Sequence, residues 1–176
     1  MVSKDNLSVT KRNGRGKESL NIEKIHSMVG FATEGISGVS ASHVEMNSGI
    51  QFFDGINTED IQQILIKSAN DLISLENPNY QYVAARLLLF SLRKNLFHRL
   101  WEHPSFLDHI KSCIKLEMYD KDILVNYTEA EIEKLNGIID HERDYNFTYA
   151  GLRQVMDKYL VQDRSNGEIF ETPQFM

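Results

Sequence analysis

The sequence of 176 residues has one cysteine, three prolines, one tryptophan and no long apolar run. Its cysteine, Cys113, excludes an internal disulfide, a CxxC redox pair and a zinc ribbon within this chain. The most apolar stretch, residues 83–90, is short and contains Arg86, and residues 1–12 lack the apolar segment of a secretory signal. These absences predict a globular protein of the cytoplasm that has no membrane partner.

Sequence motifs of nucleophilic and phosphate-transferring enzymes are also missing. The chain has no GxSxG, no Walker A loop, no GxGxxG and no HExxH. Histidines gather near the middle of the chain, but Pro104 interrupts the helix that would align them for a metal ion. These residues are His98, His103 and His109, with Glu102 beside them. The sequence therefore predicts neither a catalytic residue nor a metal site.

Two other groups with chemical potential have structural interpretations. Residues 140–144 read DHERD, a run of alternating charge that is more typical of a salt-bridge cluster at a helix end than of a catalytic centre. Cys113 lies on a short amphipathic segment, where a packing role is more typical than a reactive thiolate. We expect both groups to stabilise the fold.

Charge is distributed unevenly along the chain. The formal net charge is −6, made up of +1 over residues 1–100 and −7 over residues 101–176. A nucleic-acid-binding protein normally has a basic stripe across a whole face, so a nucleic-acid partner is not expected. The basic residues near the N-terminus suit a small anion instead.

The first half of the chain reads as four helices and a small hairpin. Alternation over residues 7–12, a turn at Asn13-Gly14 and residues 17–20 predict the hairpin. A helix is expected at 22–34, capped by Asn21 and ended by Gly35. A second helix is expected after Ser40 or Ser42, a third after Thr58 as its N-cap, and a fourth over 82–100. A short strand and turn are expected at 52–56, and residues 1–97 are expected to form one domain.

The second half is also expected to be helical, over shorter segments. The predicted helices cover about 105–116, 120–127, 128–139 and 147–160, and Thr128 with Glu131 forms a capping-box pattern. Residues 159–162 and 168–171 flank a turn signal and predict a hairpin. The fold class is therefore mainly α: a four-helix bundle capped by a small sheet, a helical region over 98–158 and a hairpin over 159–176.

The basic hairpin and the first helix together suggest an anion site. Lys11 and Arg12 lie near the turn, and Lys24 lies in the first turn of the helix, where it faces the positive end of the helix dipole. A bound phosphate would convert that unfavourable placement into a favourable one. Ordinary solvated lysines are the alternative, and the local pattern leaves both open.

Lys94 lies four residues after Phe90 on the central apolar helix, and we expect it to be partly buried and to need a partner. An anion at the end of the bundle or a carboxylate such as Asp54 or Glu59 would serve equally well. Arg86, deeper in the same helix, is expected to be a structural ion-pair residue.

Six segments in order closely resemble the N-terminal region of the large subunit of class I ribonucleotide reductase, of the bacterial and bacteriophage type. They read VTKRNG, ESLNIEKIH, GINTEDIQ, NPNYQYVAARLLLFSLRK, IDHERD and KYLVQDRSNGEIFETPQF, and the resemblance covers essentially the whole chain. Residues 1–97 resemble the ATP-cone, a regulatory domain of four helices covered by a small sheet. The resemblance implies ATP as activator and dATP as inhibitor, acting through assembly of the large and small subunits.

The resemblance also implies a set of nucleotide-binding residues. The matches to its phosphate contacts are Lys11, Arg12, Lys24, Thr58 and Lys94. The matches to its adenine contacts and pocket lining are Glu18, Asn21, Ile25, Ile61 and Phe90. Relatives of the bacterial type often have histidine at the position of Gln62, which the resemblance places next to the nucleotide sugar. This departure concerns discrimination between ATP and dATP or the strength of inhibition.

The resemblance implies a much longer reductase that makes deoxyribonucleotides for DNA replication. The expected effector is ATP or dATP with Mg²⁺, and the expected partners are the remainder of the large subunit and the radical-generating small subunit. The catalytic barrel is expected outside this chain, which would then be a fragment, a truncated gene or one piece of a split subunit, without a catalytic cofactor and not catalytically competent alone. A free-standing, nucleotide-responsive interaction module is the alternative. A bacteriophage gene would place it in the host cytoplasm.

Overall fold

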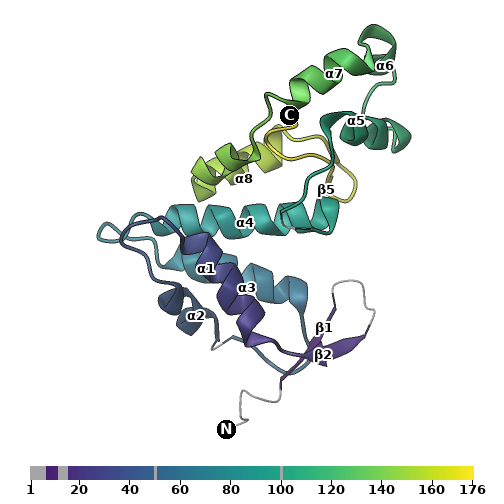
Figure 1. The fold of residues 1–176 in the computed structure, drawn as a ribbon. Helices are drawn as coiled ribbons and strands as arrows, with labels where there is room; N and C mark the ends of the chain where they lie inside the picture. The colour runs from purple at the N-terminus through teal and green to yellow at the C-terminus, as the bar shows by residue number, and fades with distance from the viewer. Residues whose placement is uncertain (1–6, 12–15, 50, 100) are drawn as a thin grey trace. The chain divides into compact units, whose positions relative to one another are not determined.

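The computed structural model describes residues 7–11, 16–49, 51–99 and 101–176. The chain divides into two compact units, shown in the ribbon of Figure 1. The first unit comprises Met1–Leu88 with Thr148–Ala150, and the second comprises Leu89–Phe147 with Gly151–Met176. Helices predominate in both, with a three-stranded sheet in the first unit and a two-stranded sheet in the second, so the expected mainly α fold is confirmed.

The sheet of the first unit has the strand order β2-β1-β3. Strands β1 (Ser8–Thr10) and β2 (Lys17–Ser19) form the antiparallel hairpin that the sequence predicts, although both strands are shorter than expected. The predicted Asn13-Gly14 turn lies outside the described residues. Strand β3 (Ile56–Asn57) pairs with β1 in parallel and closes the sheet.

Helix α1 (Ile22–Thr33) begins and ends where the sequence predicts. The Asn21 side chain accepts a hydrogen bond from the Lys24 backbone N–H at 3.1 Å, which is an N-cap. Gly35, with φ of 71°, follows the helix in the left-handed conformation that a C-terminal glycine favours. Ile22 is 54% exposed, and the buried apolar face of the helix begins one turn later at Ile25.

Helix α2 (Ala41–Gly49) packs against α1 and against α3 (Thr58–Asp71). Ser40 rather than Ser42 precedes α2 as the cap, since its hydroxyl accepts from the His43 N–H. The expectation that Thr58 caps α3 is wrong by one residue. The Asn57 side chain accepts from the Glu59 N–H at 3.0 Å, and Thr58 is the first helical residue.

Helix α4 (Tyr80–Phe97) runs from the first unit into the second. It ends earlier than the predicted Leu100, because His98 has φ of 57° and leaves the helical conformation. Arg86 donates to the carbonyl oxygens of Ala32 and Glu34 at 3.4 and 2.6 Å, at the C-terminal end of α1. These contacts satisfy carbonyl groups at a helix end, a role that the ion-pair interpretation of Arg86 did not include.

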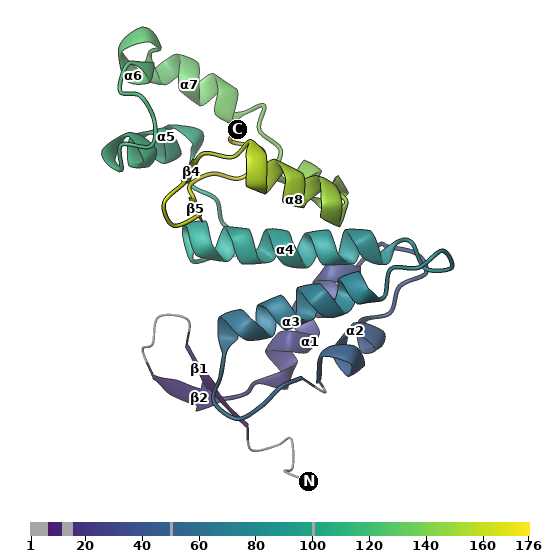
Figure 2. The ribbon, with the colours of Figure 1, turned by 180° about the vertical axis from the view of Figure 1, so that it is seen from behind.

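The second unit contains the C-terminal part of α4 and a set of short helices, drawn from the reverse side in Figure 2. Their bounds are Phe106–Lys115 (α5), Ile123–Asn126 (α6), Glu129–Asn136 (α7), the 3₁₀ helix His141–Asn146 (η2) and Tyr149–Lys158 (α8), the first two residues of which are counted with the first unit. The hairpin strands are Gln162–Asp163 (β4) and Glu168–Ile169 (β5), so β4 begins later than predicted. In the described part of the chain no helix is both long and apolar enough to span a bilayer.

Two local features of the second unit follow from its sequence. Thr128 and Glu131 form the predicted capping box, in which each side chain meets the backbone N–H of the other residue. Helices α5 and α7 share an apolar cluster of Leu107, Ile110 and Ile132.

Candidate functional site

A single carboxylate, Glu18, lies between two lysines of the predicted anion site. The Glu18 Oε2 atom is 3.2 Å from the Lys11 Nζ atom, and its Oε1 atom is 3.9 Å from the Lys24 Nζ atom. Glu18 is on β2, so the hairpin positions it between the lysine that follows β1 and the lysine in the first turn of α1. The two lysine side chains are 52% and 72% exposed and remain open to a ligand.

Strand pairing brings the N-terminus of α3 to the same end of the hairpin. Thr10 is the register partner of Asn57 in the parallel pair β1–β3. Both strands run in the same direction, so Lys11 and Thr58 leave the sheet side by side. The N-terminal end of this 14-residue helix carries partial positive charge, which favours an anion near it.

The apolar residues of the predicted site belong to the buried core of the first unit. Ile25 on α1 and Ile61 on α3 are both buried. Gln62 is 4% exposed, and its Nε2 atom donates to the Leu87 carbonyl oxygen of α4 at 2.9 Å. The Gln62 amide thereby links α3 to α4, and its role beside a nucleotide sugar remains a prediction.

Three of the predicted residues are not part of this group. Arg12 lies outside the described residues. Phe90 and Lys94 are in the second unit, where Phe90 is buried with its ring edge-on to Trp101 and Tyr145, at centroid distances of 5.5 and 6.2 Å. Lys94 is exposed, so the expectation that it is partly buried is wrong. The nucleotide contacts of these residues remain predictions.

The buried cation of α4 is Arg93, which the sequence interpretation missed. Arg93 is 2% exposed and donates to the Tyr145 hydroxyl at 2.9 Å and to the His141 carbonyl oxygen at 2.7 Å. Its guanidinium lies 3.4 Å from a carboxylate oxygen of Asp144, and burial raises the pKa of that carboxyl. Asp144 thus belongs to a structural ion pair, as expected for the DHERD run, but its partner lies on another element. Arg93 is seven residues after Arg86, a helical spacing that could have indicated it.

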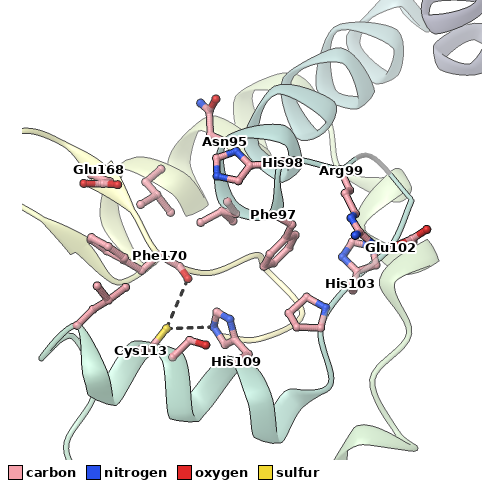
Figure 3. Close-up of a pocket in the computed structure, with 15 residues that line it drawn as sticks. Asn95, Phe97, His98, Arg99, Glu102, His103, His109, Cys113, Glu168 and Phe170 are labelled. Carbon is pink, nitrogen blue, oxygen red and sulfur yellow. Dashed lines mark hydrogen bonds and ion pairs between the residues drawn. The ribbon is translucent and has the colours of Figure 1, made fainter. Parts of the chain in front are cut away.

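A cavity of about 630 Å³ lies in the second unit, between the end of α4, α5 and the β4–β5 hairpin (Figure 3). Its lining is mixed, with apolar walls and several imidazole groups. The polar residues around it include Asn95, His98, Arg99, His103, His109 and Cys113. The sequence showed the histidines but not that separate elements would enclose a cavity around them.

Two adjacent groups of this cavity, Cys113 and His109, are held in their neutral forms near neutral pH. Burial raises the pKa of the Cys113 thiol to about 11 and lowers the pKa of His109 to about 4. The Cys113 sulfur is 3.5 Å from the His109 Nε2 atom and 3.7 Å from the Phe170 carbonyl oxygen. A neutral thiol beside a neutral imidazole is a weak nucleophile. Over the described residues, no group of three or more His, Cys, Asp or Glu side chains is arranged to hold a metal ion.

Comparison with known proteins identifies relatives across the whole chain. The chain is 49% identical over 173 residues to the ribonucleoside-diphosphate reductase subunit alpha of Buchnera aphidicola subsp. Acyrthosiphon pisum. It is 47% identical over 171 residues to the ribonucleoside-diphosphate reductase 1 subunit alpha of Escherichia coli K12, and 43% identical over 171 residues to the subunit alpha of Enterobacteria phage T4. These alignments cover 96–98% of this chain and 22% of each relative.

The ATP cone domain family matches residues 7–95. The matched segment contains the β1–β2 hairpin, the capped N-termini of α1 and α3, and the lysines that meet at Glu18. Because that match covers half of the sequence, the chain belongs to the ATP cone domain family.

Proposed function

We propose that this chain is the N-terminal regulatory part of the large subunit of a ribonucleoside-diphosphate reductase, and that its first unit binds ATP or dATP as an allosteric effector. The observation that carries the proposal is the pair of exposed lysines held by Glu18 beside the N-terminus of α1. The match of residues 7–95 to the ATP cone domain supports it independently.

The electrostatics of the group suit a polyphosphate. Lys11 and Lys24 supply two exposed positive charges, and the N-termini of α1 and α3 add partial positive charge. Glu18 keeps the two lysines together without removing them from solvent. A triphosphate tail adds enough negative charge to compete with one carboxylate for both lysines. Mg²⁺ enters this proposal only as the ion that accompanies the nucleotide.

Regulation in this proposal follows from linkage. A nucleotide that binds one assembly state more tightly than another shifts the equilibrium by the difference in its binding free energies. The assembly partners are the remainder of the large subunit and the radical-generating small subunit. Reduction of ribonucleotides takes place in a catalytic barrel outside this chain, and this chain acts by changing which assembly forms. The setting is the cytoplasm.

Relatives that are whole reductase subunits favour this function over a free-standing interaction module. Under the proposal, the residues predicted for the nucleotide site act in binding and none of them in catalysis. The roles predicted for Phe90 and Lys94 rest on the family resemblance alone, because both residues belong to the second unit.

Calorimetric titration of the 176-residue chain with ATP and with dATP tests the nucleotide site. Replacing Lys24 with alanine is expected to weaken ATP binding by about tenfold, because one charge-assisted contact to phosphate is worth about 1.5 kcal/mol. Lys67→Ala is a matched control, since Lys67 is an exposed lysine of the same unit in the middle of α3. Binding that Lys24→Ala leaves unchanged, or that Lys67→Ala weakens equally, would contradict the assignment of the site.

A further inference from the structure

Asp54 fastens the start of the lysine-bearing hairpin to the turn that precedes β3. A single carboxylate oxygen, Oδ1, accepts hydrogen bonds from the Ser8 backbone N–H at 2.8 Å and from the Ser8 hydroxyl at 2.7 Å. These two bonds lower the pKa of Asp54, the backbone bond contributing most, and the carboxyl is therefore ionised near neutral pH. Ser8 is the first residue of β1, so the carboxylate holds the strand at its beginning.

The residue after Asp54 extends the same attachment. The Gly55 N–H donates to the Ser8 carbonyl oxygen at 2.9 Å, and the Thr10 hydroxyl donates to the Gly55 carbonyl oxygen at 3.1 Å. Gly55 has φ of 81°, a conformation that side chains other than glycine rarely adopt. Four hydrogen bonds thus join the Asp54-Gly55 turn to β1, and we call this set of contacts the β1 clasp.

The β1 clasp fixes a register that the strands alone specify weakly. The ladder between β1 and β3 contains two residue pairs, Val9 with Ile56 and Thr10 with Asn57. A slip of one residue would turn Val9 away from the core, where both it and Ile56 are buried. This register also sets Lys11 beside the N-terminus of α3, because Lys11 follows Thr10 directly.

We propose that Asp54, acting with Ser8, is a positioning residue of the nucleotide site, which holds Lys11 and the Glu18-bearing hairpin at the N-terminus of α3. This inference rests on the proposed nucleotide binding. Asp54 itself needs no contact with the ligand: it acts through β1, by keeping the hairpin lysine where a phosphate tail passes the first turn of α3. Losing the clasp lets Lys11 move away while the core beneath it stays packed.

The ratio of the ATP and AMP affinities measures lysine placement separately from folding. Calorimetry on the 176-residue chain gives both dissociation constants. ATP has two phosphates that AMP lacks, so the difference between the two affinities reflects how well the lysines are placed to bind phosphate. Asp54→Ala is expected to weaken ATP binding by about tenfold and AMP binding by about twofold or less, a difference of the size expected for one lost charge-assisted contact. Asp54→Asn retains an acceptor oxygen and is expected to restore most of the ATP affinity.

Asp71→Ala serves as the charge-matched control, because it removes one exposed carboxylate at the C-terminal end of α3. It is expected to leave the ratio of the two affinities unchanged. Equal weakening of ATP and AMP binding by Asp54→Ala would show a loss of folded protein only and would overturn the positioning role. Unchanged ATP binding by Asp54→Ala would overturn it as well. Failure of the unsubstituted chain to bind ATP would instead contradict the proposed function, and this inference with it.

Discussion

Replacing Arg93 with alanine is expected to lower the free energy of unfolding of the second unit by about 3–5 kcal/mol, the range typical of breaking a buried ion pair by removing one partner. Both partners are almost fully buried, at 2% exposed for Arg93 and 1% for Asp144. Without the guanidinium, Asp144 would keep a hydrogen bond from the Gln174 side chain at 3.2 Å but would lose the positive charge of its ion pair. The Asp144 carboxyl must then take up a proton, or the 3₁₀ helix that bears it must open to water, and either response lowers stability.

Urea unfolding followed by the fluorescence of Trp101 measures this effect, because the single tryptophan lies in the second unit and contacts Phe90. Arg99→Ala is the control, since its ion pair with Glu102 is exposed and is expected to contribute less than about 1 kcal/mol. The double variant Arg93→Ala, Asp144→Ala is expected to be more stable than Arg93→Ala alone, because the unpaired carboxylate has been removed. Equal losses for Arg93→Ala and Arg99→Ala would contradict the structural role of the buried pair.

Acid is expected to destabilise the second unit at pH values well above those at which exposed carboxylates titrate. His109 is 4% exposed, its ring stacks on Phe175 at 4.3 Å, and burial lowers its pKa to about 4. His103 and His141 stack on each other at 3.8 Å, and burial is also the largest cause that lowers the pKa of each to about 4. The buried Nδ1 atoms of His103 and His141 have no hydrogen-bond partner among the described residues.

The direction of the effect follows from the depressed pKa values of these bases. The folded second unit favours neutral imidazoles, so their contribution to stability is complete above pH 6.5 and is lost as the pH falls toward 4. His109 alone accounts for about 3 kcal/mol between its unfolded pKa of 6.5 and its folded pKa of about 4. Asp144 acts in the opposite direction, because burial raises its pKa and its protonation favours the folded state. Because three histidines destabilise the folded unit in acid and one carboxyl stabilises it, the second unit is expected to lose stability as the pH falls.

Urea midpoints from Trp101 fluorescence at several pH values between 7 and 4 test this prediction. His109→Phe keeps an aromatic ring against Phe175 and is expected to make the pH dependence less steep. His98→Asn changes an exposed imidazole of the same cavity, at a residue with φ of 57° that asparagine tolerates, and is expected to keep the original pH dependence. A stability that stays constant from pH 7 to pH 4.5 would contradict the account of the buried histidines.

Local sequence signals predicted the elements that carry the proposed site. The Asn21 cap, the Gly35 stop and the hairpin were all predicted, because each depends on interactions between residues close together in sequence. The Thr128 capping box was predicted for the same reason. Thr58 was misplaced by one residue because Asn57 beside it is an equally good cap, and only the pairing of β3 with β1 decides between them.

Contacts between distant residues could not be predicted in this way. Lys94 was predicted to be partly buried and Arg93 was not singled out, because an almost uniformly apolar helix does not show which of its faces is buried most deeply. The Asp144 partner lies 51 residues from Arg93, and Asp54 lies 46 residues from Ser8. Contacts between residues this far apart produce no periodic pattern in the sequence. The resemblance to a known family assigned nucleotide roles, whereas the structure shows how Glu18 joins two of the lysines.

The most direct test of the central claim is an NMR titration of the isotopically labelled chain with ATP, read at the backbone amide of each residue. The account predicts that the largest shifts occur at Lys11, Glu18, Lys24 and Thr58, with the amides of α5 and α7 unchanged. Shifts confined to the cavity lined by His109 and Cys113, or no shift at millimolar ATP, would contradict the assignment of the first unit as the nucleotide sensor.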